Sequence, residues 1–168
     1  MAHTALDVYL NDHLGGATLG TDLAGQLLER SQGTPLGVVM AQVAPQIGED
    51  RQTLADLMER LGTARNPVKQ ATAWVTGKAT RAKFGGATSA DPEFGLFMAL
   101  ETLTLGVAGK LTLWKSLRDV AGEHPPLAAT DLDDLIARAE AQYDALENER
   151  SSAGRRVLGD GKESATPK

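Results

Sequence analysis

Apolar residues recur at every third or fourth position over four long stretches of the chain. In the first stretch this spacing gives the series Leu6, Leu10, Leu14, Ala17, Thr21, Ala24 and Leu28. Residues 36–61, 91–120 and 130–158 repeat the pattern. A period of three to four residues places side chains on one face of a helix. The pattern therefore predicts four amphipathic helices, the first over about residues 4–31.

The residues that flank these stretches are types that begin or bend helices. Pro35 suits the first turn of the second helix, and Ser89 or Asp91 can cap the third. Thr130 is the expected cap of the fourth helix, because it precedes a run of acids that the helix dipole favours. Pro45 falls inside the second stretch, where its missing amide predicts a kink.

The connections between the four stretches differ in length, and their lengths predict the topology. Short connections join the first helix to the second and the third to the fourth, so each pair is expected to form an antiparallel hairpin. About 29 residues separate the second and third helices, enough to follow a helix of about 40 Å from end to end. We therefore predict an all-α fold, a single domain over residues 1–158 with an up-down-down-up four-helix bundle. An extra helix is expected over about residues 66–84 in the crossover, and the polar tail 159–168 is expected to be disordered.

The composition excludes several kinds of fold, chemistry and partner. The chain has 168 residues, 42% of them hydrophobic and only 4% aromatic, which favours closely packed helices over a sheet. It has no cysteine, which excludes disulfides, thiolate nucleophiles and iron–sulfur clusters. The formal net charge of −5 makes nucleic acid an unexpected partner. We found no secretion signal and no continuous apolar run of membrane length, so a cytoplasmic protein that does not bind membranes is expected.

Three segments resemble a known family in their spacing. The stretch "LNDHLGGATLG" is similar to the opening of bacterioferritin-type helices, "EDRQTLADLMERLG" to the first Glu-x-x-His helix of that family, and "AEAQYDALE" to the second. The resemblance implies a ferritin-like fold with a dinuclear iron or manganese centre held by four carboxylates and two histidines. The positions that correspond to the six ligands are Ala17, Asp50, Thr53, Glu101, Ala139 and Gln142.

These six positions imply a degenerate metal centre. Only Asp50 and Glu101 carry carboxylates, and alanine cannot bind a metal at all. We therefore expect no metal, no cofactor and no catalytic residue, and a non-catalytic structural or binding module; if any metal binds, Asp50, Glu101 and His13 are the candidate ligands. One alternative is a metal-binding protein for iron storage or oxidation, whose iron or manganese ligands lie elsewhere. A second alternative is a carrier of a small molecule in the bundle interior.

The two carboxylates have a structural interpretation as well. Asp50 and Glu101 fall on or beside apolar stripes, where a buried charge needs a partner. We expect both to point inward and to join a polar network, with Arg150 as the counter-charge. His13 is expected to be a partly exposed histidine near the rim of the bundle.

Two other features bear on partners. The connector holds the basic residues Lys69, Lys78, Arg81 and Lys83 and no acid, so it is either a partner surface or a face that neutralises an acidic bundle. Gly106 and Gly109 are expected to allow close helix contact, and a homo-oligomer, most simply a dimer, follows from such a contact.

Overall fold

The computed structural model describes residues 4–64 and 91–159. All regular structure in these two ranges is helical, which confirms the all-α prediction for this part of the chain. The elements are α1 (Ala5–Arg30), α2 (Pro35–Arg60), α4 (Pro92–Asp119), η1 (Ala121–Glu123), α5 (Pro125–Ala128) and α6 (Leu132–Leu158). The expected crossover helix over 66–84, its basic residues and the tail beyond residue 159 lie outside the described residues.

The long helices begin where their capping residues predict, with one exception. Thr4 and Asp7 form a reciprocal capping box at the start of α1, and the Asp91 carboxylate accepts from the first amides of α4. The expected cap of α6 was wrong by one residue. Asp131 accepts from the Asp134 amide at 3.0 Å, whereas the Thr130 hydroxyl donates back to a carbonyl of the preceding turn. That turn is part of α5, a short helix that the sequence pattern did not predict.

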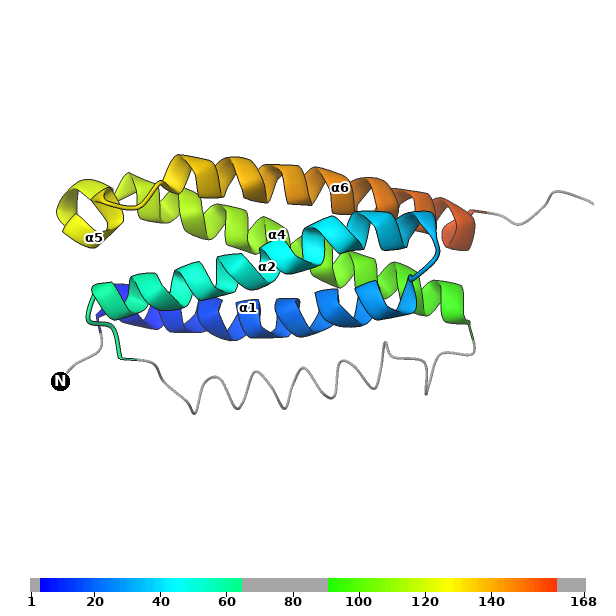
Figure 1. The fold of residues 1–168 in the computed structure, drawn as a ribbon, viewed down its shortest axis with the longest axis horizontal. Coiled ribbons are helices and arrows are strands. Elements are labelled where there is room, and N and C mark those ends of the chain that lie inside the picture. Colours follow the sequence, from blue (N-terminus) through cyan, green and yellow to red (C-terminus); the bar gives the residue numbers. More distant parts are fainter. Residues whose placement is uncertain (1–3, 65–90, 160–168) are drawn as a thin grey trace, which may run out of the picture.

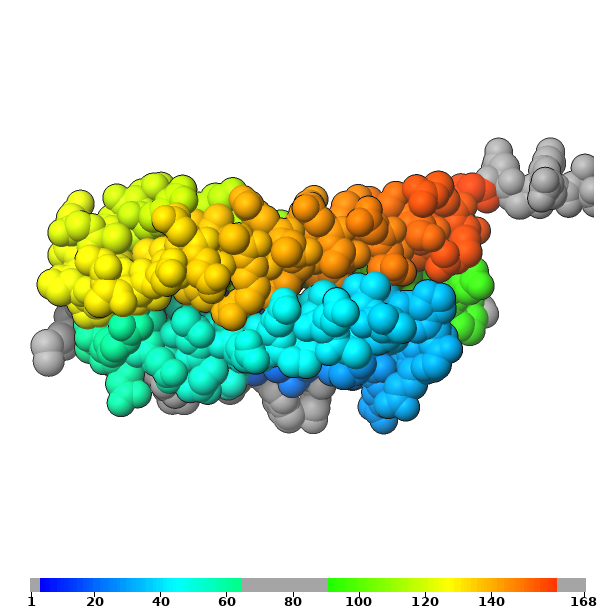
Figure 2. Space-filling model, turned by 45° about the horizontal axis from the view of Figure 1, so that its top comes forward, coloured from blue at the N-terminus to red at the C-terminus, as the bar shows by residue number. Residues whose placement is uncertain are grey.

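The four long helices lie side by side (Figure 1). α1 and α2 run antiparallel, and so do α4 and α6, whereas α2 and α4 run in the same direction. α1 contacts both α2 and α4, and α6 contacts α4 and α2. The space-filling view shows α2 and α6 lying against each other along one face of the molecule (Figure 2). This arrangement is compatible with a four-helix bundle.

The apolar side chains form two separate clusters. One contains Leu14, Leu54, Leu113 and Ala139, among others, and the other contains Val107, Ile47 and Leu146 with their neighbours. On α2, α4 and α6 a short gap along the helix separates the members of the two clusters. Each fully buried leucine stabilises the fold by about 1.5–3 kcal/mol, so any polar residue in the gap interrupts the main source of stability.

α4 has the mean hydropathy of a helix that could cross a membrane. In the described residues it is the one helix long and apolar enough to cross a membrane, by length and composition alone, with a mean hydropathy of 1.4 over its best window. This does not contradict the prediction that the chain has no continuous apolar run of membrane length, because Glu101, Lys110 and several threonines interrupt α4, and its leucines, alanines and valine give the high mean. A helix at the centre of a protein passes the same test, and α4 packs along both α6 and α1.

Candidate functional site

A buried carboxylate occupies the gap between the two apolar clusters. Asp50 lies on α2, one helical turn from Ile47 on one side and from Leu54 on the other. It is only 1% exposed. An unpaired carboxylate at this depth would strongly destabilise the fold, so its partners decide what the site is.

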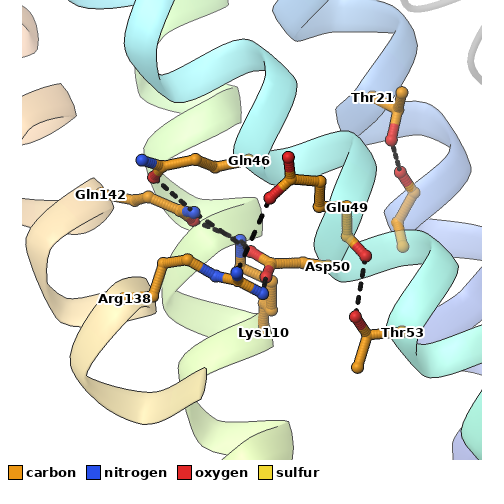
Figure 3. Close-up of polar contacts among 9 residues, drawn as sticks. Thr21, Gln46, Glu49, Asp50, Thr53, Lys110, Arg138 and Gln142 are labelled. Atoms are coloured by element: carbon orange, nitrogen blue, oxygen red, sulfur yellow. Dashed lines mark hydrogen bonds and ion pairs between the residues drawn. The ribbon is translucent and has the colours of Figure 1, made fainter. Parts of the chain in front are cut away.

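Two cations neutralise Asp50 from two different helices (Figure 3). The Lys110 ammonium on α4 bonds to Oδ2, and the Arg138 guanidinium on α6 bonds to Oδ1. The side-chain amide of Gln142 also donates to Oδ2, at 3.1 Å. Three helices therefore meet at one carboxylate.

The amide of Gln142 extends this network. Its oxygen accepts from Lys110, and its nitrogen donates to Gln46 Oε1 at 3.1 Å as well as to Asp50. We call Gln46, Asp50, Lys110, Arg138 and Gln142 the polar layer. Hydrogen bonds of this kind fix the orientation of each member, since every buried polar group needs a partner.

The polar layer holds more positive than negative charge. Lys110 and Arg138 carry one positive charge each, and Asp50 carries the one fully buried carboxylate. Glu49 lies 3.7 Å from the Arg138 guanidinium, but its side chain is 65% exposed and faces a solvent that screens it. Burial lowers the pKa of Lys110, an effect that the nearby Asp50 carboxylate opposes. The layer therefore has an excess of positive charge inside the protein.

The structure brings together only some of the predicted ligand positions. Asp50 and Gln142 are hydrogen-bonded, as the register of the resemblance requires of facing positions. Glu101 does not join them: its side chain is 38% exposed and lies 3.5 Å from Arg150. Arg150 is therefore a counter-charge of Glu101, as predicted, but it does not neutralise Asp50, and the prediction that Glu101 points inward beside Asp50 was wrong. The residue of α4 that faces Asp50 is Lys110, about two and a half turns further along.

The other three positions contribute no ligand either. The Thr53 hydroxyl donates to the backbone carbonyl of Glu49 at 2.9 Å. Ala139 is fully buried in an apolar cluster, and Ala17 lines a cavity described below. His13 is partly exposed, as expected, and its ring packs edge-on against Tyr9 with the ring centres 4.5 Å apart. Burial lowers the His13 pKa, and the Asp12 carboxylate opposes that shift.

These residues do not fit a dinuclear metal centre. Two iron or manganese ions need several bridging carboxylates and imidazoles. Within residues 4–64 and 91–159, no three histidine, aspartate or glutamate side chains lie close enough to share a metal. The one central carboxylate is already bound by two cations of the chain itself.

A cavity of about 540 Å³ lies beside the polar layer, between α1, α2 and α4. Asp50 and Lys110 form part of its wall, and most of the rest is apolar. Four glycines line it, namely Gly16, Gly20, Gly106 and Gly109. Among the described residues, a Cβ at Gly106 or Gly109 would meet no atom of a neighbouring element within 4 Å, so the predicted close contact at these glycines does not lie within this part of the chain, and a dimer contact there stays a prediction.

Lys110, Arg138 and Gln46 were not predicted as site residues, although the position of Lys110 in the sequence carries a signal. Lys110 follows Val107 by three residues and precedes Trp114 by four, so it falls on the apolar face of its helix. A lysine on such a face, opposite an aspartate on another apolar face, predicts a buried ion pair. No comparable pattern marks Arg138.

The described residues thus define an all-helical protein with a buried ion-pair layer and an adjoining apolar cavity. Comparison of the chain with protein-family models, with curated proteins and with solved structures finds no match.

Proposed function

We propose that this chain is a ferritin-like four-helix bundle of up-down-down-up topology that has lost its dinuclear metal centre and works as a non-catalytic binding module. The equal direction of α2 and α4 supports the topology (Figure 1). α2 ends and α4 begins at opposite ends of the molecule, as in bundles with one long crossover.

One observation carries the proposal. The carboxylate at the position where the family has a metal ligand is neutralised by Lys110 and Arg138 instead. A metal ion offsets the charge of buried carboxylates, and here two side chains of the protein supply that positive charge. An incoming cation would have to displace both of these side chains.

Metal analysis tests this proposal. We expect protein produced with added iron and manganese to contain far less than one metal ion per chain after gel filtration, and to leave the rate of Fe²⁺ oxidation by oxygen unchanged. A bacterioferritin prepared in the same way is the positive control. About two tightly bound iron or manganese ions per chain would overturn the proposal and support a storage or oxidation role.

The cavity favours a second, more specific role, the carriage of a small molecule in the bundle interior. Its volume lies within the range of about 300–1,000 Å³ that is typical of small-molecule sites. Ala17, which stands where the family has a glutamate, lines this cavity. Loss of that ligand therefore leaves space as well as removing charge. A cytoplasmic location, a homodimer and a partner surface on the basic connector stay predictions.

A further inference from the structure

The glycines that line the cavity have no packing role among the described residues. A Cβ added at Gly16, Gly20, Gly106 or Gly109 would meet nothing within 4 Å. A glycine in a helix interior costs about 0.5–1 kcal/mol relative to alanine. Glycines usually offset that cost where two backbones approach closely, and the described residues show no such approach at these four positions. Their effect is to keep the volume between α1 and α4 open.

The cavity is elongated along the helices. On α4 its lining runs from Ala99 to Trp114, which is about 22 Å of helix, whereas a sphere of 540 Å³ would be only about 10 Å across. Aliphatic side chains from three helices form the greater part of the wall, among them Leu23, Leu27, Ile47, Leu54, Leu103 and Val107. Gly16 and Gly106 are exposed, so the cavity reaches the surface. Its shape and lining suit a linear apolar molecule.

The charges around the cavity favour an anionic group on that molecule. Among the described residues, Lys110 and Arg51 balance Asp12 and Asp50 in its wall, and Arg30 lies at the end of α1. Arg138 adds a further positive charge on the far side of Asp50. Positive charge inside a protein attracts an anion more strongly than charge at the surface does, because solvent screens it less.

The cavity wall also contains a hydrogen-bond donor on the same helix as Lys110. Trp114 lines the cavity and is fully buried, and its indole Nε1 has no acceptor among the described residues. It follows Lys110 by four residues, so the two side chains share one face of α4. A buried donor without an acceptor is uncommon, and a ligand oxygen would satisfy it once the indole turned toward the cavity, since the nitrogen is shielded from solvent here.

We propose that the cavity binds a linear apolar molecule with one anionic head, of the fatty-acid class, with its carboxylate near Lys110 and Trp114 and its chain along α1 and α4. This inference rests on the proposed binding role and deepens it.

Three ten-carbon probes test the head group. Decanoate, decanol and decylamine share the chain and differ in charge. The reporter is Trp114 fluorescence in a Trp74→Phe background, which removes the one other tryptophan, and calorimetry gives the affinities. We expect decanoate to bind at least tenfold more tightly than decanol, and decylamine to bind more weakly than decanol. Equal affinities for decanoate and decanol would overturn the anionic class but keep a binding role.

Two leucine variants on the same helix test the location. Gly20→Leu fills the cavity, whereas Gly25→Leu places the same side chain on an exposed position of α1 that does not line it. A Cβ at either glycine meets nothing within 4 Å, so both variants should fold and both gain helix propensity. We expect Gly20→Leu to weaken decanoate binding at least tenfold and Gly25→Leu to leave it unchanged. Equal binding by the two variants would overturn the site.

A third variant distinguishes recognition of the anionic head from binding of the apolar chain. Lys110→Met should reduce the preference for decanoate over decanol toward onefold while decanol binding persists. If no probe binds the parent protein, the carrier role fails, and the metal analysis above still decides the loss of the metal centre independently.

Discussion

Asp50 and Lys110 are partners in one ion pair, yet their removal should not be equally costly. Asp50→Asn leaves the Lys110 and Arg138 charges together in the core with no carboxylate that both can bind. Breaking a buried pair in this way typically costs about 3–5 kcal/mol of unfolding free energy. The two side chains are 13% and 25% exposed, so water relieves part of the penalty. We expect a loss of about 3 kcal/mol.

Lys110→Met leaves a better-balanced core. Asp50 keeps Arg138 and the Gln142 amide, one buried charge disappears, and methionine fills most of the space of the lysine stem. The main loss is the donor to the Gln142 oxygen. An unmade buried hydrogen bond costs about 1–3 kcal/mol. We therefore expect a loss of about 1–2 kcal/mol, clearly less than for Asp50→Asn.

Denaturation in urea, followed by circular dichroism at neutral pH, measures both values and that of the double variant. Groups in direct contact are not additive, so the double variant should lose about 1–2 kcal/mol less than the two single variants together. The slope of unfolding free energy against urea concentration should be the same for all variants if each unfolds in one step. Glu140→Gln is the control, because it breaks an ion pair with Lys115 at the surface and should leave the midpoint where it is.

The relative loss of stability in the two single variants tests whether the polar layer holds an excess of positive charge. If Asp50→Asn is no more destabilising than Lys110→Met, the polar layer does not hold an excess of positive charge in the folded protein. Full additivity in the double variant would contradict the direct contact itself.

Further predictions concern the dependence of stability on pH and the ion pair between Glu101 and Arg150. Burial lowers the Lys110 pKa from its ordinary value of 10.5, so between the folded and unfolded pKa values the unfolded chain binds more protons than the folded one. The unfolding free energy of the parent should therefore rise with pH over that range, and that of Lys110→Met should not. Denaturation curves of both proteins at several pH values measure this difference. The His13 pKa is lowered from 6.5, so the parent should lose stability as pH falls through that region, and His13→Asn should lose less over the same range; parallel curves would contradict this. Glu101→Leu should change the urea midpoint little, because its contact with Arg150 is part-exposed, and a large loss would show that the pair holds the core together.

The helices and most of their ends could be predicted from the sequence. Apolar spacing, Pro35, Asp91 and the acids after residue 130 depend only on contacts within a few residues, and such contacts act the same way in any fold. The all-helical class and a buried role for Asp50 follow from the same local pattern. The one wrong cap was at Thr130, where two adjacent residues could both cap a helix and only the tertiary path of the chain chose between them.

The tertiary structure decided which residues meet. Periodicity assigns a side chain to a face of its helix but not to a level along the bundle, and neighbouring helices can slide by a turn without changing their patterns. Glu101 and Lys110 both lie on α4, but only Lys110 is level with Asp50. Gly106 and Gly109 likewise fit the pattern of contact residues, yet within the described part of the chain the separation of α1 and α4 leaves them in the wall of a cavity. The sequence therefore determined the helices and the polar residues available to them, and the relative shift of the helices determined that these residues form an ion-pair layer beside a cavity.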